Sequence, residues 1–125
     1  MEARRVLHYG ADSSFRTEVL RFAGYDVEEC TCAAEFVRRL RSGWNADLIC
    51  ITESPDAPAE GALAMANSFS SAPVVLFRVS NHSYIQRTWD LEVQPLTSPS
   101  VWLKDVATLV SSRPIRFPQL STSGL

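Results

Sequence analysis

The sequence predicts an α/β fold with three layers, in which helices cover both faces of a five-stranded parallel sheet. Short apolar segments alternate along the chain with segments whose apolar residues recur at helical spacing. Two of the short segments, residues 48–51 and 74–77, are apolar throughout, which is typical of strands buried on both faces. Strands and helices that alternate in this way form a parallel sheet between two layers of helices.

The first strand covers residues 5–10 and ends at Gly10. Asp12 or Ser13 is expected to cap the helix that follows, because their side-chain oxygens accept hydrogen bonds from a first helical turn. The apolar residues of this helix fall on one helical face: Phe15, Val19, Phe22 and Ala23. A glycine then ends the helix, and the second strand follows at residues 25–31.

The second helix covers residues 33–42 and has arginines on its solvent face. Its buried stripe is expected to be Phe36, Val37 and Leu40. The third strand runs from Asp47 to Thr52 and becomes polar abruptly at its end. That end is of interest because open α/β sheets bind ligands at the carboxyl ends of their strands.

The second half of the chain continues the alternation after a loop with two prolines. We expect a helix at residues 62–69, a strand at 73–77, a weak helix at 83–88, a strand at 91–94 and a last helix that ends near residue 112.

The last helix begins with Ser98 and Pro99, a cap followed by a first-turn proline. Its core-facing residues are expected to be Leu103, Val106, Ala107 and Val110. Residues 113–125 are rich in Pro and Ser and have no periodicity. We therefore expect one domain of residues 1–112 followed by a flexible tail.

The composition narrows the classes of function. The chain has 125 residues, of which 46% are hydrophobic and 21% charged, as in an ordinary globular domain. A net charge of −2 gives no basis for binding nucleic acid. The longest apolar runs are far shorter than the ~20 residues that a membrane span needs. No signal-peptide core follows the N-terminus, so a cytoplasmic protein is the default expectation.

The three cysteines are Cys30, Cys32 and Cys50, an odd count that favours reduced, buried thiols. A metal site would need His8 or His82 as further ligands, and their spacing matches no metal motif. His8 lies in a central strand and is expected to be packed and hydrogen-bonded. Without a nucleophile motif or a phosphate-cradling loop, we expect neither a cofactor nor enzyme activity.

Two strand orders fit this alternation, the flavodoxin-like order 2-1-3-4-5 and a fragment of a Rossmann sheet. A Rossmann sheet favours a glycine-rich turn after its first strand, and this turn offers Gly10 alone. Residues 4–112 resemble the receiver domain of bacterial response regulators. Residues 47–51 look like the family's third strand, residues 72–76 like the entry to its fourth, and Gln94-Pro95 like its lysine-proline pair after the fifth. The resemblance implies the flavodoxin-like order and a role in two-component or phosphorelay signalling.

The resemblance also locates the family's phosphoryl-accepting pocket, and the residue types there are different. The family's metal-binding acids fall on Gly10 and Ala11 with Asp12 one step late, its phosphoacceptor on Thr52, its hydroxyl residue on Arg78, its lysine on Gln94 and its switch aromatic on Leu91. Mg²⁺ is held by carboxylate oxygens, and a threonine without an adjacent base is a poor nucleophile. We therefore expect a pseudo-receiver, which has lost the phosphoacceptor site and acts by phosphorylation-independent protein–protein interaction.

Two charged residues border this pocket. We interpret Glu53 as a solvated loop acid in preference to a built-in negative charge that mimics activation. Arg78 either pairs with Asp12 or Glu53 or stays solvated. The alternative function uses the same arginine in a sensor of small anionic ligands, with Arg78, Thr52 and Asp12 lining the pocket.

Aromatic and apolar residues gather in the last third of the chain: Tyr84, Ile85, Trp89, Leu91 and Trp102. By resemblance they belong to the face of the fourth helix, fifth strand and fifth helix, which receiver-like domains use for dimers and partner domains. Aromatic residues are enriched at interface centres. We expect a protein partner or a homodimer at this face, with packing inside the domain as the alternative for Trp102.

Overall fold

The computed structural model of the protein describes residues 4–11, 15–42, 45–54, 59–79, 84 and 88–112. Its strands are β1 (Arg5–Tyr9), β2 (Asp26–Cys30), β3 (Leu48–Thr52), β4 (Val74–Phe77) and β5 (Leu91–Val93). Its helices are α1 (Arg16–Phe22), α2 (Ala33–Arg41), α3 (Glu60–Phe69) and α4 (Pro99–Ser112). The predicted alternation is confirmed for these elements.

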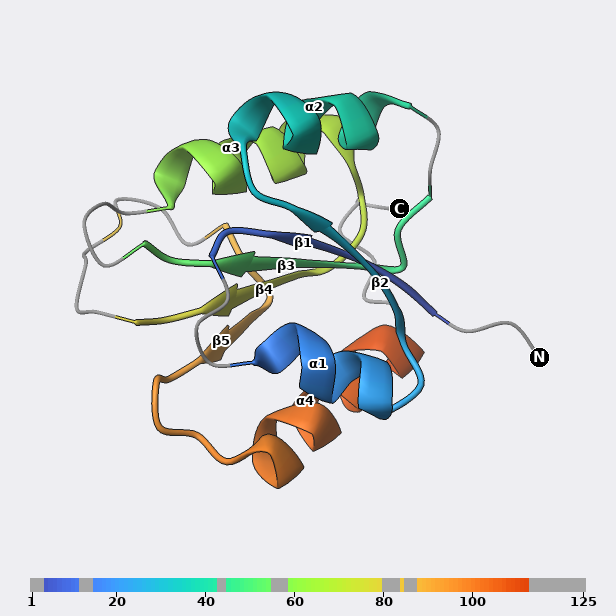
Figure 1. Cartoon of the computed structure of the whole chain (residues 1–125), viewed down its shortest axis with the longest axis vertical. Helices are drawn as coiled ribbons and strands as arrows, with labels where there is room; N and C mark the ends of the chain where they lie inside the picture. Colours follow the sequence, from blue (N-terminus) through green and yellow to red (C-terminus); the bar gives the residue numbers. More distant parts are fainter. Residues whose placement is uncertain are drawn as a thin grey trace, which may run out of the picture.

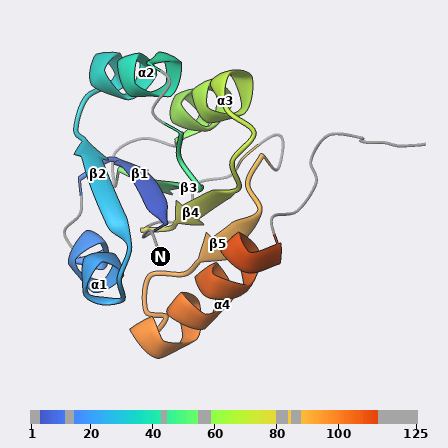
Figure 2. The same ribbon diagram turned by 90° about the vertical axis from the view of Figure 1, so that its right-hand side faces the viewer.

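The described strands form one parallel sheet in the order β2-β1-β3-β4-β5. This is the flavodoxin-like order, with β1 and β3 on either side of the point where the chain reverses its direction across the sheet. Helices α2 and α3 cover one face, and α1 and α4 cover the other (Figure 1, Figure 2). The predicted three-layer fold is confirmed.

The strands send alternate side chains into two separate cores. Leu48 and Cys50 of β3 join the core beneath α1 and α4, whereas Ile49 and Ile51 join the core beneath α2 and α3. Every residue of β3 is buried, as expected for a central strand covered on both faces. A fully buried Leu or Ile contributes about 2 kcal/mol, so β3 stabilises both layers at once.

The buried face of α1 differs from the predicted one. Phe15 and Phe22 are 69% and 96% exposed and Ala23 is exposed too, whereas Val19 of the predicted stripe does pack against the core. The residues buried under the helix are Arg16, Thr17 and Leu20. The cause is the late start of the helix: Phe15 is the N-cap residue, with a left-handed φ of 57°. The helix therefore presents a face turned by about one residue from the predicted stripe. The predicted caps, Asp12 and Ser13, lie outside the described residues.

The other amphipathic helices follow the predicted phase more closely. In α2, Phe36 is fully buried, and Val37 and Leu40 are half-buried. In α4, which begins at Pro99 as predicted, the buried residues are Trp102, Val106 and Val110. Leu103 is half-buried, whereas Ala107 is exposed and does not belong to the predicted stripe.

The described cysteines are free thiols. Cys30 and Cys50 are buried as predicted, but Cys32 is exposed because it precedes α2 as its N-cap residue instead of continuing β2. Burial, with Glu35 nearby, raises the pKa of the Cys30 thiol to about 11, so this thiol stays protonated and unreactive at neutral pH.

Two predicted segments lie largely or wholly outside the described residues. They are the weak helix at 83–88, of which only Tyr84 and Thr88 are described, and the tail at 113–125. Among the helices that are described, none combines the length and the apolar character that crossing a membrane requires.

Candidate functional site at the carboxyl edge of the sheet

The carboxyl ends of the strands bring most of the predicted pocket residues to one edge of the sheet. Gly10 follows β1, Thr52 ends β3, Arg78 follows β4 and Gln94 follows β5. Asp12 lies outside the described residues. The side chains at this edge divide into two groups, because successive residues of a strand point to opposite faces.

Gly10 holds the ends of β1 and β3 close together. Its φ is +118°, which a residue with a side chain rarely adopts, and an added Cβ would lie 2.5 Å from the carbonyl oxygen of Thr52. The Gly10 amide also donates a hydrogen bond to the Cys30 carbonyl at 3.1 Å, which ties β1 to the end of β2. The glycine is therefore required by the backbone, whatever the site binds.

Thr52 turns its hydroxyl toward His8, in the layer of α1 and α4. The Thr52 Oγ1 atom and the His8 Nε2 atom are 2.7 Å apart and form a buried hydrogen bond, in which the donor depends on the imidazole tautomer. His8 is fully buried and Thr52 is 6% exposed. The prediction that His8 is packed and hydrogen-bonded is confirmed.

Glu53 is buried, so the interpretation of it as a solvated loop acid is wrong. Its side chain is 0% exposed. One carboxylate oxygen accepts the Val79 amide at 2.9 Å, and the other accepts the Tyr84 hydroxyl and lies 3.0 Å from Arg78 Nε. A buried carboxylate needs such partners. Because successive residues of a strand point to opposite faces of the sheet, Glu53 faces the side opposite to that of Thr52.

Arg78 is held by acids from two strands. Besides Glu53, its guanidinium contacts Glu92 of β5 at 3.2 Å, and it lies 5.2 Å from the centre of the Tyr84 ring. Glu92 also accepts a hydrogen bond from the Gln94 amide. Of the alternatives that the sequence leaves open for Arg78, pairing with Glu53 is the one observed. We call Glu53, Arg78, Tyr84 and Glu92 the Glu53 network.

The Glu53 network shifts the pKa values of Glu53 and Tyr84. Burial alone raises the pKa of Glu53, but the hydrogen bonds from Tyr84 and the Val79 amide, together with Arg78, outweigh burial and hold that pKa below its ordinary value. Burial and the hydrogen bond to Glu53 raise the pKa of Tyr84 to about 12. At neutral pH Glu53 is therefore a carboxylate and Tyr84 a neutral phenol.

A second buried guanidinium lies at the same edge, in the opposite layer. Arg16 is 4% exposed, its Cζ atom is 4.6 Å from the centre of the Phe77 ring, and its Nη2 atom donates to the Pro95 carbonyl at 3.4 Å. Within the described part of the chain, no group of His, Cys, Asp or Glu residues is arranged to hold a metal ion. The described residues at this edge therefore fit a divalent cation poorly.

A cavity of about 450 Å³ opens beside the Glu53 network, and we call it the strand-end cavity. It extends across the ends of β1 and β3 to the first turns of α2 and α3. Its lining includes Gly10, Ala11 and Thr52 from the predicted pocket. Arg78 is not among the described residues that line it, so the expected combination of Arg78 with Thr52 in one ligand pocket is not formed.

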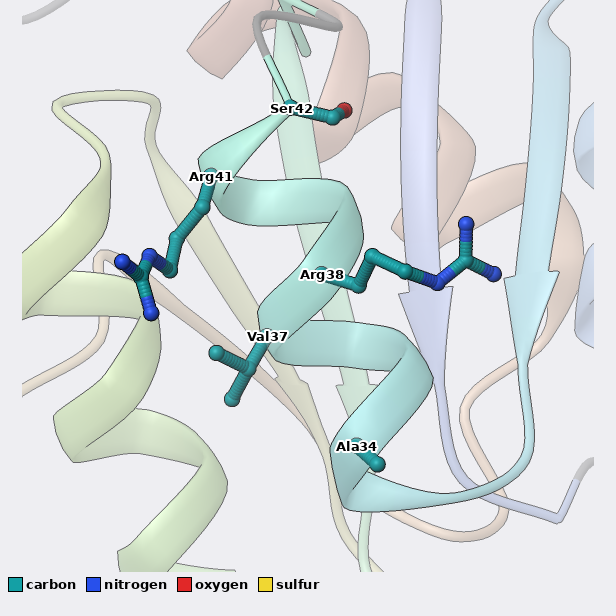
Figure 3. A pocket seen from close by; sticks show the side chains of 5 residues that line it. All are labelled: Ala34, Val37, Arg38, Arg41 and Ser42. Atoms are coloured by element: carbon teal, nitrogen blue, oxygen red, sulfur yellow. The ribbon is translucent and has the colours of Figure 1, made fainter.

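A second hollow, of about 530 Å³, lies along α2 and is lined by Ala34, Val37, Arg38, Arg41 and Ser42. Figure 3 shows Val37 and Arg41 on the side of the helix toward α3, and Arg38 on the opposite side. The Arg41 guanidinium lies 5.8 Å from the centre of the Phe69 ring in α3. Because the lining comes from one helix and the two guanidinium groups diverge, polar groups do not converge here.

The aromatic residues expected at a partner face pack largely inside the domain. Trp102 is 2% exposed and packs edge-on against Phe77, with ring centres 5.3 Å apart. Tyr84 packs edge-on against Trp89 at 5.2 Å, and both are only partly exposed. Leu91 is half-buried and packs against the core beneath α1 and α4. The alternative of internal packing holds for Trp102, and Ile85 lies outside the described residues.

The fold is that of response-regulator receiver domains. The structure resembles a response regulator receiver domain protein (CheY-like) from Methanospirillum hungatei JF-1, with a TM-score of 0.71, 14% sequence identity, and coverage of 90% of this chain and 97% of that one. It also resembles the N-terminal domain of a response regulator/sensory box/GGDEF 3-domain protein from Carboxydothermus hydrogenoformans, with a TM-score of 0.69, 19% identity, and coverage of 87% and 95%.

A third similar structure is the chemotaxis response regulator CheY4 of Vibrio cholerae, with a TM-score of 0.63, 15% identity, and coverage of 86% of this chain and 98% of that one. No protein-family model matches the chain, and no curated protein matches its sequence. At these identities the likeness establishes the fold, and function has to be argued from the residues at the carboxyl edge.

Three residues that contribute to this edge of the sheet are not predicted from the sequence as parts of the site. Glu92 becomes predictable only with the strand register, which pairs Glu92 with Leu76, two residues before Arg78. Tyr84 is expected at a partner surface, whereas its hydroxyl accepts the Ala59 amide at 3.1 Å and donates to Glu53. Arg16 carries no sequence signal, because a lone arginine at a helix start is ordinarily solvated.

Proposed function

We propose that this protein is a receiver-fold signalling module that works through protein–protein interaction and without accepting a phosphoryl group. The observation that supports this most directly is the buried pair of Glu53 and Arg78, 3.0 Å apart and closed over by Tyr84. The structural neighbours are response regulators, which gives the signalling context. We assign the module no enzyme activity of its own.

The chemistry of phosphoryl acceptance supports this reading. Transfer to a carboxylate needs a carboxylate at the strand end and a cation to neutralise the developing charge. Thr52 stands at the strand end, and its hydroxyl is engaged with His8 at 2.7 Å. Gly10 and Ala11 supply no oxygen ligands from their side chains. Arg78 places a fixed positive charge where the resemblance expects a hydroxyl group.

The Glu53 network connects three segments of the chain. Tyr84 joins Glu53, which follows β3, to Ala59, which precedes α3, and Arg78 joins both to β5. Hydrogen bonds to charged groups contribute about 1.5–3 kcal/mol each, so the network is well suited to hold one conformation. A module held in one conformation presents the same surface to its partner at all times.

We place the partner surface on the loop after β5 and the first turn of α4, beside the face that the sequence indicates. The aromatic residues of that face pack inward, but Leu96 is 97% exposed and Val101 is 52% exposed. Exposed apolar surface is typical of interaction sites. The partner is a second copy of the chain or another protein, in the cytoplasm, where free thiols such as Cys32 persist.

The alternative, a sensor of small anionic ligands, has less support. Glu53 and Glu92 both contact Arg78, so an approaching anion would meet two carboxylates around the only guanidinium of the Glu53 network. The strand-end cavity contains no charged side chain among its described lining residues.

Incubation with acetyl phosphate and Mg²⁺, followed by intact-protein mass spectrometry, tests the proposal. We expect no Mg²⁺-dependent gain of a phosphoryl group, while a receiver domain that retains its aspartate gains one under the same conditions. A stoichiometric, Mg²⁺-dependent phosphoryl adduct on this chain would refute the proposal.

A further inference from the structure

The strand-end cavity has the size and position of a ligand site. Its volume of about 450 Å³ lies within the range of about 300–1,000 Å³ typical of small-molecule pockets. It spans β1 and β3, the two strands between which the chain reverses its direction across the sheet. Ligands in open α/β sheets bind at this point. The position therefore favours a ligand independently of phosphoryl chemistry.

Small residues keep the cavity open. Six of its lining residues are glycine or alanine: Gly10, Ala11, Ala33, Ala59, Gly61 and Ala62. At Gly61 an added Cβ would meet no atom within 4 Å, so the space beside this position is open. The ring of Tyr9, stacked on Phe36 at 4.8 Å, gives one wall an aromatic surface.

The lining favours an uncharged molecule. None of the described residues that line the cavity carries a charged side chain, and a charged molecule loses hydration on an apolar surface without compensation. Thr31 and Ser54 bring hydroxyl groups to the lining. Their oxygen atoms can accept a hydrogen bond from an N–H group of a bound molecule.

We propose that the strand-end cavity binds a small, uncharged, largely apolar molecule, aromatic in part and carrying a hydrogen-bonding group. This goes beyond the proposed function, because it requires neither a partner protein nor the absence of phosphorylation. The cavity also borders the Glu53 network. Ala59 lines the cavity and donates its amide to Tyr84, so a bound molecule contacts a residue that the network holds.

Two fluorescent probes with the same ring skeleton test the proposal: phenylnaphthylamine, which is uncharged, and anilinonaphthalene sulfonate, which is anionic. We expect the wild-type chain to bind phenylnaphthylamine saturably at one site and at least about tenfold more tightly than the sulfonate, a ratio that corresponds to about 1.4 kcal/mol. No saturable binding of phenylnaphthylamine, or tighter binding of the sulfonate, would overturn the proposal.

Variants assign the binding to the cavity. Gly61→Leu fills the open space in α3 and is expected to weaken phenylnaphthylamine binding at least about tenfold, whereas Gly61→Ala retains it. Ala33→Leu blocks the opposite wall and serves if Gly61→Leu unfolds the protein. Phe22→Ser removes an aromatic ring that is 96% exposed and leaves binding unchanged. Binding that survives both leucine variants, or that is lost in Phe22→Ser, would show that the probe occupies another surface.

Discussion

The position of the Glu53 side chain distinguishes an open, charged pocket from a buried network. In solvent it would be a mobile charge at the mouth of a pocket, but here it is buried and bound to Arg78, Tyr84 and the Val79 amide. A buried carboxylate without partners costs several kcal/mol, so the network around Glu53 has to remain intact. Residues of the carboxyl edge therefore serve the fold as well as any function.

Removing one partner of the buried pair should be costly. We expect Arg78→Met to lower the free energy of unfolding by about 3 kcal/mol, because Glu53 is left charged and buried. The double variant Glu53→Gln/Arg78→Met should lose at least about 1 kcal/mol less than the sum of the single variants. Urea unfolding at pH 7 measures the free energy of unfolding of Glu53→Gln, Arg78→Met and the double variant.

Arg39→Met is the matched control for this cycle. Arg39 pairs with Glu28 at the same distance, 3.0 Å, but both side chains are about one third exposed or more. An exposed pair contributes about 0.5 kcal/mol or less. If Arg78→Met costs no more than Arg39→Met, the Glu53 network does not stabilise the domain.

The loss of folding stability at acidic pH should reflect the protonation of Glu53. Its pKa is held below the ordinary value of 4.5, so its contribution to stability is complete above pH 4.5 and is lost as the pH falls below that value through the folded pKa. Wild type should therefore lose stability more steeply below pH 4.5 than Glu53→Gln, measured by urea unfolding from pH 7 downward. Parallel curves for the two proteins would contradict the pKa shift.

Among the elements, strands follow the sequence more closely than helix faces do. The unbroken apolar character of β3 and β4 predicts their burial, since a strand covered on both faces has no polar side. The stripe of α1 is mispredicted, because its phase depends on the left-handed turn at Phe15 that starts the helix. The helical periodicity of apolar residues carries no signal for such a turn.

The same distinction applies to the candidate site. Order and spacing along the chain predict that Gly10, Thr52 and Arg78 meet at one edge, and the structure places them there. Order and spacing do not predict to which face of the sheet a side chain points once its strand has ended. Glu53 and Tyr84 therefore required the structure, because a polar loop residue is ordinarily solvated and an aromatic near an expected interface is ordinarily exposed.

The turn after β1 offers a test at the scale of the element. Gly10→Ala combines a strained φ of +118° with a contact of 2.5 Å to the Thr52 carbonyl, and should cost about 3 kcal/mol or more. Gly24→Ala has a similar φ of +103° but open space around the added Cβ, and should cost about 1 kcal/mol. Thermal unfolding of the two variants separates strain from overlap. Equal losses would mean that β1 and β3 do not approach as described.

At the scale of the whole molecule, the receiver fold carries three features: the Glu53 network, the strand-end cavity, and an exposed apolar surface on α4 and the loop that precedes it. Each depends on different side chains, so a variant can be chosen that alters one of them directly. A fixed network and an accessible surface fit a constitutive binding module better than a switch.

The surface is tested by a double variant, Leu96→Asp/Val101→Asp. Both side chains are exposed, so we expect the melting temperature to change little while self-association or partner retention is lost, measured by light scattering and by co-purification. Phe69→Ser, on α3 in the opposite layer, is the matched control and should leave association intact. A wild-type chain that stays monomeric and retains no partner would remove the support for this surface.

The most direct test of the central claim is a titration with beryllofluoride and Mg²⁺, followed by amide NMR spectra of the ¹⁵N-labelled chain. Beryllofluoride occupies the phosphoryl position only where a carboxylate and a metal site are both present. We predict no saturable, Mg²⁺-dependent shifts of the amides of Gly10, Thr52, Glu53 or Arg78. Saturable shifts at these residues, lost when Mg²⁺ is removed, would contradict the account and show that the carboxyl edge still accepts a phosphoryl group.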